Sequence, residues 1–131
     1  MAERLLTAQL EQAFQLDGIE ITSEQWRVLF YLWNEDGINQ RELAKRVKKE
    51  KSTITRQIDT LERKGLIERH SLNEDKRNKQ LFVTQQGKII EERTLHIAQS
   101  ITEKAEASIH KTELKIFRKV LQQMILNIEQ M

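Results

Sequence analysis

The 131-residue sequence contains no cysteine and no proline, and it has only four glycines. Without cysteine the chain can form no disulfide, no thiolate metal site and no thiol-based redox switch. A chain of this length can bury a hydrophobic core without such links, so we expect a single domain. The lack of cysteine is also typical of an intracellular protein.

Long hydrophobic runs are absent as well. No stretch approaches the roughly 20 apolar residues that a membrane-spanning helix needs. The first residues, MAERLLTAQLEQAF, are interrupted by charged and polar side chains, so they lack the apolar segment of a signal peptide. These absences predict a cytoplasmic protein that does not associate with membranes.

The common catalytic patterns are missing too. The sequence shows no Ser-His-Asp order, no apolar carboxylate pair, no glycine-rich phosphate loop and no cysteine nucleophile. The three histidines, His70, His96 and His110, are too dispersed along the chain to define a metal site. We therefore expect no enzyme activity, no cofactor and no metal ion.

Basic residues are concentrated in the middle of the chain. Residues 41–79 contain 13 of the 22 lysines and arginines but only 7 of the 20 acidic residues, a local net charge of +6. The rest of the chain carries −4. A basic region between acidic flanks is typical of a protein that binds a polyanion, usually nucleic acid. A solvated charged surface without such a ligand is the alternative.

Three helices are predicted before residue 50. Apolar residues at a spacing of four indicate a short amphipathic helix over residues 3–16. Thr22 and Gln25 form a capping-box pattern that opens a second helix, which is apolar on most sides and therefore central. Asn39 and Glu42 repeat the pattern before a short third helix.

The next segment, EKSTITRQIDTLERKGLI, predicts a helix over residues 51–64. Ile54, Ile58 and Leu61 recur at i, i+4 and i+7, so one face is expected to be buried. The opposite side of the first turns carries small hydroxyls and two cations, although serine and threonine are mediocre helix formers. These outward residues are Lys51, Ser52, Thr53, Thr55 and Arg56.

Two short helices joined by a tight turn, with hydroxyls and cations at the head of the second, indicate a helix-turn-helix. The second helix of this motif lies in the major groove of DNA, and its N-terminal residues meet the bases. Arg56 can bind guanine with two hydrogen bonds, and Lys51 can contact a phosphate. The alternative for Ser52 and Thr53 is helix capping alone, which leaves Thr55 and Arg56 unexplained.

A small β-ribbon is predicted after this helix. LIERH and QLFVT read as two short strands, and the polar segment SLNEDKRNK between them forms the ribbon tip. Lys76, Arg77 and Lys79 can reach the DNA backbone or the minor groove, where arginine is favoured. Asp75 can hold the Arg77 guanidinium in one rotamer. The alternative is a loop with scattered charges.

The C-terminal third predicts two helices. Thr84 caps a long helix, and Thr112 opens the last one. Apolar residues in the last helix alternate in steps of three and four, a narrow stripe suited to another helix. They are Leu114, Phe117, Leu121, Met124 and Ile128.

Together these pieces resemble the MarR family of winged helix-turn-helix regulators over about residues 21–90. The resemblance depends on TSEQW, RELAKRV, KSTITRQIDTLERKGLIER, DKR and VTQQG in this order and spacing. It implies a mainly α fold with a small β-wing in one domain, residues 1–131. A winged helix-turn-helix lobe at about 21–84 lies between dimerisation helices at about 1–20 and 85–131.

The resemblance also implies an obligate homodimer on a pseudo-palindromic DNA duplex. By this resemblance Asp75 and Arg77 match the Asp-x-Arg of the wing, whose arginine enters the minor groove. The recognition-helix positions match Lys51, Ser52, Thr53, Thr55 and Arg56. An exposed apolar stripe on the last helix independently favours a dimer. The first helix is short, so residues 112–131 are expected to contribute more of the interface.

Many members of the family release DNA when a small, often aromatic anion binds between the dimer helices and the DNA lobes. By position, Trp26, Tyr31 and His96 are candidates for contacting such an aromatic or phenolic effector, although tryptophan in a helical stripe is more often a core residue. The absence of cysteine excludes the peroxide-sensing branch of the family. Phe82 occupies a strand position that is usually polar, and the sequence leaves open whether it is packed or exposed.

The function these features predict is sequence-specific binding of double-stranded DNA by a transcriptional regulator, most often a repressor. The alternatives are a ligand-independent or nonspecific DNA-binding protein and a winged-helix protein-interaction module. The local positive charge argues against the interaction module. Competition with unrelated DNA would separate nonspecific from specific binding.

Overall fold

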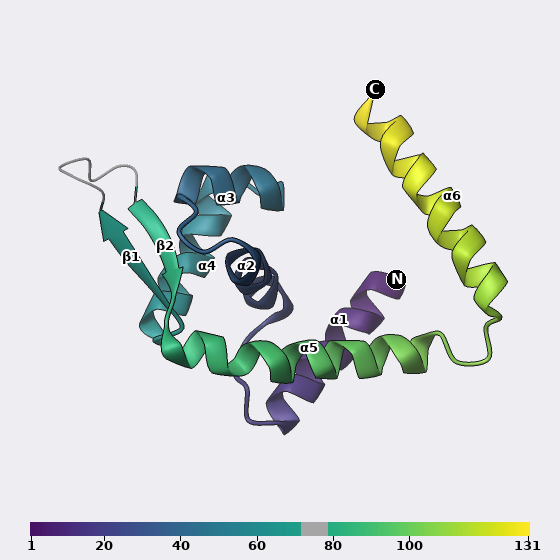
Figure 1. Ribbon diagram of the computed structural model, residues 1–131, viewed down its shortest axis with the longest axis horizontal. Coiled ribbons are helices and arrows are strands. Elements are labelled where there is room, and N and C mark those ends of the chain that lie inside the picture. Colours follow the sequence, from purple (N-terminus) through teal and green to yellow (C-terminus); the bar gives the residue numbers. More distant parts are fainter. Residues whose placement is uncertain (72–78) are drawn as a thin grey trace. The chain divides into compact units, whose positions relative to one another are not determined.

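The computed structural model describes residues 1–71 and 79–131 (Figure 1). Within these ranges the chain forms six helices and a two-stranded antiparallel sheet, and none of the helices is long and apolar enough to cross a membrane. The chain divides into two compact units, residues 1–98 and residues 99–131. The elements are α1 (Ala2–Leu16), α2 (Ser23–Asn34), α3 (Gln40–Val47), α4 (Lys51–Arg63), β1 (Ile67–Ser71), β2 (Lys79–Val83), α5 (Gln85–Ala105) and α6 (Lys111–Glu129).

The predicted capping box at the start of α2 is confirmed. Thr22 Oγ1 accepts a hydrogen bond from the backbone N–H of Gln25, and Gln25 Oε1 accepts one from the backbone N–H of Thr22, both at 3.1 Å. Glu11 of α1 adds a contact that the sequence pattern did not indicate, because its Oε1 accepts the N–H of Ser23 at 2.8 Å. The first turn of α2 is therefore held both locally and from α1.

A three-residue turn joins α3 to α4. Asn39 caps α3 as predicted, since its Oδ1 accepts the backbone N–H of Glu42 at 2.8 Å. Lys48 ends α3 in the left-handed conformation, with φ 58° and ψ 38°. This conformation reverses the chain sharply enough for α4 to begin at Lys51. The two helices and this turn form the predicted helix-turn-helix.

The hydrophobic core of the first unit draws on four helices and both strands. The predicted inner face of α4 is confirmed, because Ile54, Ile58 and Leu61 are at most 1% exposed. On the sheet, Ile67, Leu81 and Val83 also point into the core. The remaining buried apolar residues are Phe14, Ile19, Ile21, Val28, Leu29, Leu32, Ile38, Leu43 and Val47.

β1 and β2 form an antiparallel ribbon in which Ile67 lies opposite Val83. The loop between α2 and α3 pairs with the other edge of β2. The Gly37 N–H donates to the Leu81 carbonyl and the Leu81 N–H donates to the Ile38 carbonyl, both at 2.9 Å. β2 is therefore bonded on both edges, which connects the ribbon to the helix-turn-helix.

Phe82, whose environment the sequence left open, is half-buried on β2. Its ring meets the His70 ring edge-on across the ribbon, with 5.1 Å between centroids. A Cβ atom at Gly37 would lie 3.2 Å from the Phe82 ring, so the ring also covers the glycine backbone. Phe82 thus packs across the ribbon on the face away from the core residues Leu81 and Val83.

Thr84 caps α5 as predicted, because its Oγ1 accepts the backbone N–H of Gly87 at 3.1 Å. Its hydroxyl also donates to the Gly65 carbonyl at 2.6 Å, which ties the end of α4 to the start of α5. Gly87 is required here for space, since a Cβ atom would lie 2.3 Å from the Leu66 carbonyl oxygen. Trp33 Nε1 donates to the Gly87 carbonyl at 3.0 Å.

The second unit contains the end of α5 and all of α6. The prediction that Thr112 opens the last helix is wrong by one residue, because α6 begins at Lys111. His110 is the N-cap, and its Nδ1 accepts the Thr112 N–H at 3.1 Å. The helix buries no residue within this chain. Its large exposed apolar residues include Ile116, Phe117, Val120, Leu121, Met124, Ile125, Leu126 and Ile128.

Candidate nucleic-acid interface

Helix α4 turns its polar residues away from the core. Because its inner face is buried, Lys51, Ser52 and Arg56 are exposed at the helix surface, and Thr53 and Thr55 are half-buried beside them. This is the arrangement that the sequence predicted for a recognition helix. The structure therefore brings these five predicted residues together on one side of one helix.

The start of α4 tests the alternative that Ser52 and Thr53 serve only to cap the helix. Glu50, with φ −61° and ψ 144°, is the N-cap residue, and the helix has no side-chain cap hydrogen bond. Ser52 and Thr53 lie in the first turn beyond the cap, so capping does not account for them. Their hydroxyls occupy the end of α4 that a helix-turn-helix presents to bases.

Thr55 makes two hydrogen bonds that sequence reasoning missed. Its Oγ1 donates to the Lys51 carbonyl at 2.8 Å, and it accepts a hydrogen bond from Gln40 Nε2 at 2.7 Å. Gln40 is the first residue of α3, so this contact links the two helices of the motif. The i, i−4 spacing of Thr55 and Lys51 permits the first bond, but no local pattern indicated Gln40 as the partner.

Helix α4 is held against the start of α2 at two places. Gln57 Nε2 donates to Glu24 Oε2 at 2.8 Å. Just beyond the C-terminal end of α4, Lys64 Nζ donates to Gln25 Oε1 at 3.0 Å and to the Glu20 carbonyl. The orientation of α4 relative to α2 is therefore restrained at its middle and at its C-terminal end, which fixes the direction of its outward face.

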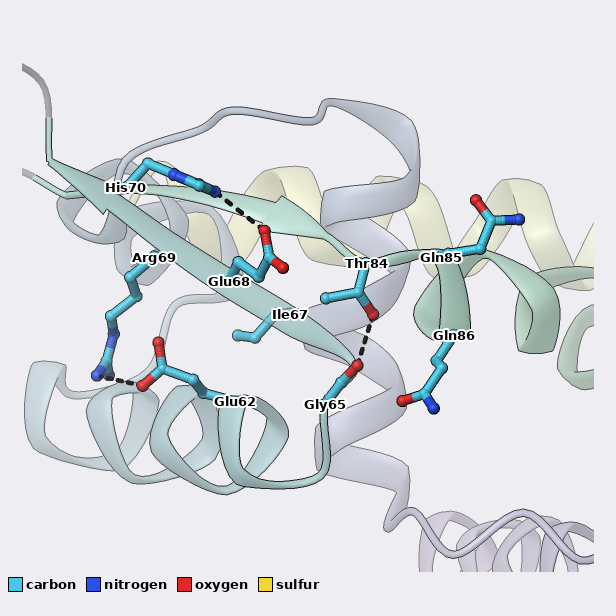
Figure 2. Close-up of a pocket in the computed structure, with 9 residues that line it drawn as sticks. All are labelled: Glu62, Gly65, Ile67, Glu68, Arg69, His70, Thr84, Gln85 and Gln86. Atoms are coloured by element: carbon cyan, nitrogen blue, oxygen red, sulfur yellow. Dashed lines mark hydrogen bonds and ion pairs between the residues drawn. The ribbon is translucent and has the colours of Figure 1, made fainter.

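Arg69 on β1 connects the ribbon to α4. Its guanidinium forms ion pairs with Asp59 and Glu62, and its side chain is only 16% exposed. Figure 2 shows Arg69 and Glu62 on one side of an open groove, with the Thr84–Gly65 hydrogen bond on the other. Both sets of contacts join elements to one another, so we read this groove as a structural junction.

The predicted wing contacts fall largely outside the described ranges. Asp75, Lys76 and Arg77 lie among residues 72–78, so their roles stay predictions. Lys79 is the first residue of β2, half-buried and opposite Ser71. It therefore lies at the tip-proximal end of the ribbon, where a wing contact with DNA is expected.

One cation of the motif is already paired with carboxylates. The Arg46 guanidinium on α3 pairs with Glu35 and with Glu42, and the hydrogen bond to Glu35 raises the pKa of Arg46. The same residue accepts the Tyr31 hydroxyl through its backbone carbonyl at 3.2 Å. These pairs reduce the net positive potential that α3 offers to a phosphate.

Two of the three candidate effector residues share an aromatic neighbour, because the Phe30 ring meets both Trp26 and Tyr31. Trp26 packs between Phe14 and Phe30, with ring centroids 6.0 Å and 5.9 Å away. Tyr31 is directed to α3 by its bond to Arg46, and His96 is exposed on α5. The role of Trp26, Tyr31 and His96 in binding an effector therefore stays a prediction. Across residues 1–71 and 79–131, no group of three or more histidine, aspartate or glutamate side chains is arranged to hold a metal ion.

The fold and the outward face of α4 define a winged helix-turn-helix protein. Residues 21–79 match the model of the MarR family. Among solved structures, a MarR transcriptional regulator from Methanosarcina mazei Go1 is 28% identical, with a TM-score of 0.86 over 98% of this chain and 92% of that one. The S. aureus MepR–DNA complex is 25% identical, with a TM-score of 0.87 over 97% of this chain and 93% of that one.

A curated relative agrees with these structural matches. The organic hydroperoxide resistance transcriptional regulator of Bacillus subtilis (strain 168) is 27% identical over 86 residues. The match covers 66% of this chain and 58% of that relative's length. Over residues 21–79 the chain is therefore similar to the MarR family. The predicted fold class, mainly helical with a small β-wing, is confirmed by the helices and the two-stranded ribbon of residues 1–71 and 79–131 and by these similar structures.

Proposed function

We propose that this protein is a transcriptional regulator in the cytoplasm that binds double-stranded DNA in a sequence-specific manner. The burial of Ile54, Ile58 and Leu61 carries the proposal, because it turns the side of α4 that bears Ser52 and Arg56 to solvent. A helix held in this way can enter the major groove with its N-terminal side chains toward the bases. The similarity to MepR, which was crystallised with DNA, supports the same conclusion.

The proposed assembly is a homodimer on a pseudo-palindromic operator. Helix α6 leaves a continuous apolar stripe uncovered, and Phe117, Leu121 and Met124 are 63%, 44% and 54% exposed. Such a stripe is stable in water when a second apolar surface covers it. A two-fold dimer would place two copies of α4 about one helical turn of DNA, roughly 10 base pairs, apart.

We further propose repression as the mode of action, with release from DNA by a small aromatic or phenolic effector. Support for the effector is the aromatic group of Phe14, Trp26 and Phe30 at the contact of α1 with α2. An effector acts through the difference in its affinity for the DNA-competent and other states. The alternative, a ligand-independent or nonspecific DNA-binding protein, needs no such site.

In vitro selection of duplexes from random DNA tests the proposal. We expect a recovered sequence with inverted half-sites whose centres are about one helical turn apart. Specific binding should exceed binding to a scrambled duplex by at least about 1,000-fold at physiological salt. Recovery of no preferred sequence would leave only nonspecific binding, and no binding at all would favour the protein-interaction module.

A further inference from the structure

Thr55 stands on the outward side of α4, yet its hydroxyl is already engaged. A threonine hydroxyl has one hydrogen to donate and two lone pairs that accept. The hydrogen goes to the Lys51 carbonyl at 2.8 Å, and one lone pair receives Gln40 Nε2 at 2.7 Å. Thr55 therefore has no donor left for a base unless one of these bonds is broken.

This restricts what Thr55 can recognise in a major groove. Guanine offers acceptors at N7 and O6, and adenine offers an acceptor at N7, so hydrogen bonds to these atoms need a donor that Thr55 lacks. The amino groups of adenine N6 and cytosine N4 could meet only the one remaining lone pair of the Thr55 hydroxyl. Thymine offers a C5 methyl group, which is contacted by apolar side-chain atoms such as a threonine methyl. The group that Thr55 retains for an apolar contact is its Cγ2 methyl.

We propose that Thr55 recognises thymine through its methyl group, and that Gln40 is a positioning residue that holds Thr55 in this role. The inference rests on the proposed function, because it assigns a base preference to a residue of the same helix. Gln40 is half-buried at the start of α3, so its amide is presented to Thr55 by a helix whose own start is capped by Asn39. Loss of the Gln40 amide leaves the Thr55 side chain held only by its bond to the Lys51 carbonyl, so its methyl group is less firmly oriented.

The test uses the full-length protein and the duplex recovered by selection. Each thymine of a half-site is replaced in turn by deoxyuridine, which removes only the C5 methyl group. We expect one thymine whose replacement weakens wild-type binding about fourfold per half-site, the effect of roughly one buried methyl group. Two variants distinguish the two groups of the Thr55 side chain. Thr55→Ser keeps the hydroxyl and removes the Cγ2 methyl, whereas Thr55→Val keeps that methyl and replaces the hydroxyl with a second one.

Thr55→Ser is expected to bind the thymine duplex about as weakly as the wild type binds the deoxyuridine duplex, and to show no difference between the two. Thr55→Val is expected to retain the difference. A serine variant that still discriminates thymine from deoxyuridine at every position would overturn the inference. So would a valine variant that loses the discrimination while its circular dichroism and melting temperature stay those of the wild type.

Gln40→Met tests the positioning role, since methionine matches the length of glutamine without its amide. In the wild-type background this variant should reduce the thymine preference and leave the salt dependence of binding unchanged, because no phosphate contact is removed. In the Thr55→Val background it should have no further effect. An equal loss in both backgrounds would show that Gln40 acts on DNA or on folding independently of Thr55.

Failure of the proposed function gives a different result. In that case the wild type binds the selected and scrambled duplexes equally, and both the proposed function and the thymine inference are wrong. If the wild type prefers the selected duplex but no single thymine methyl group contributes, only the inference about Thr55 is wrong.

Discussion

Lys64 Nζ lies 3.0 Å from Gln25 Oε1, so the end of α4 is bonded to the capped start of α2. Gln25 is itself only 6% exposed, and its side chain also accepts the Thr22 N–H. One amide oxygen thus serves both the cap of one helix and the anchor of another. Losing the lysine leaves the oxygen with its local partner alone.

Lys64→Met should lower the free energy of unfolding by about 1 kcal/mol, because a charge-assisted hydrogen bond is lost at a partly exposed site. Urea denaturation followed by circular dichroism measures this change. Lys45→Met is the matched control, since Lys45 is an exposed lysine on α3. Equal stability of the two variants would mean that the Lys64 bond contributes nothing measurable.

Gly87→Ala should destabilise the protein by about 1–3 kcal/mol, because the new methyl would lie 2.3 Å from the Leu66 carbonyl oxygen and 2.6 Å from Val83 Cγ1. Gly18→Ala is the comparison. Gly18 has φ 77° and open space around its Cα, so it should cost only about 1 kcal/mol for the left-handed backbone. A Gly87 variant as stable as the wild type in urea denaturation would contradict the close approach of α5 to Leu66.

Arg56→Ala should weaken binding to the selected duplex by about 1–3 kcal/mol and relax the base preference at one position of each half-site. Arg63→Ala is the control on the same helix, because Arg63 lies in the last turn of α4 and bonds to Thr60. Fluorescence anisotropy with single-base variants of the duplex measures both effects. Unchanged base preference in the Arg56 variant would remove this residue from the interface.

Arg77→Ala should weaken binding and reduce the dependence of log affinity on log salt concentration by about one unit, because one phosphate or minor-groove contact is lost. Lys79→Ala, at the start of β2, should show a similar but separate decrease. Titrations at several salt concentrations give the slopes. Slopes equal to that of the wild type for both variants would place the wing away from the DNA.

Leu121→Lys should shift the protein from dimer to monomer, because it places a charge in the apolar stripe of α6. Gln122→Lys is the matched control, since it adds the same charge one residue along the helix outside that heptad-like stripe. Sedimentation velocity at several concentrations distinguishes the two species. A Leu121 variant that remains as dimeric as the control would show that α6 does not form the interface.

Much of the fold was predictable because its determinants are local. The capping box of Thr22 and Gln25 and the spacing of Ile54, Ile58 and Leu61 each depend on residues within about two helical turns, so period and chemistry indicate the structure directly. The start of α6 was missed by one residue because histidine, which caps it, is not among the preferred capping residues.

The parts that could not be predicted depend on contacts between distant segments. Gln40 meets Thr55 across the motif, and Lys64 reaches Gln25 from 39 positions away in the chain. The sequence could place Thr55 on the outward face of α4, but not determine which of its hydrogen-bonding groups were already occupied. Packing of Phe82 against His70 likewise depends on the register of the ribbon, which local patterns do not specify.

The contact from Glu11 to the Ser23 N–H has a practical consequence for anyone who trims this protein to a minimal DNA-binding fragment. The family match begins at residue 21, and a fragment cut there would omit the carboxylate that completes the first turn of α2. It would also omit the Glu20 carbonyl that receives Lys64. Such a fragment would carry every proposed DNA-contacting side chain of α4, but the start of α2, on which α4 packs, would lose one of its contacts. A fragment that retains α1 would keep that contact.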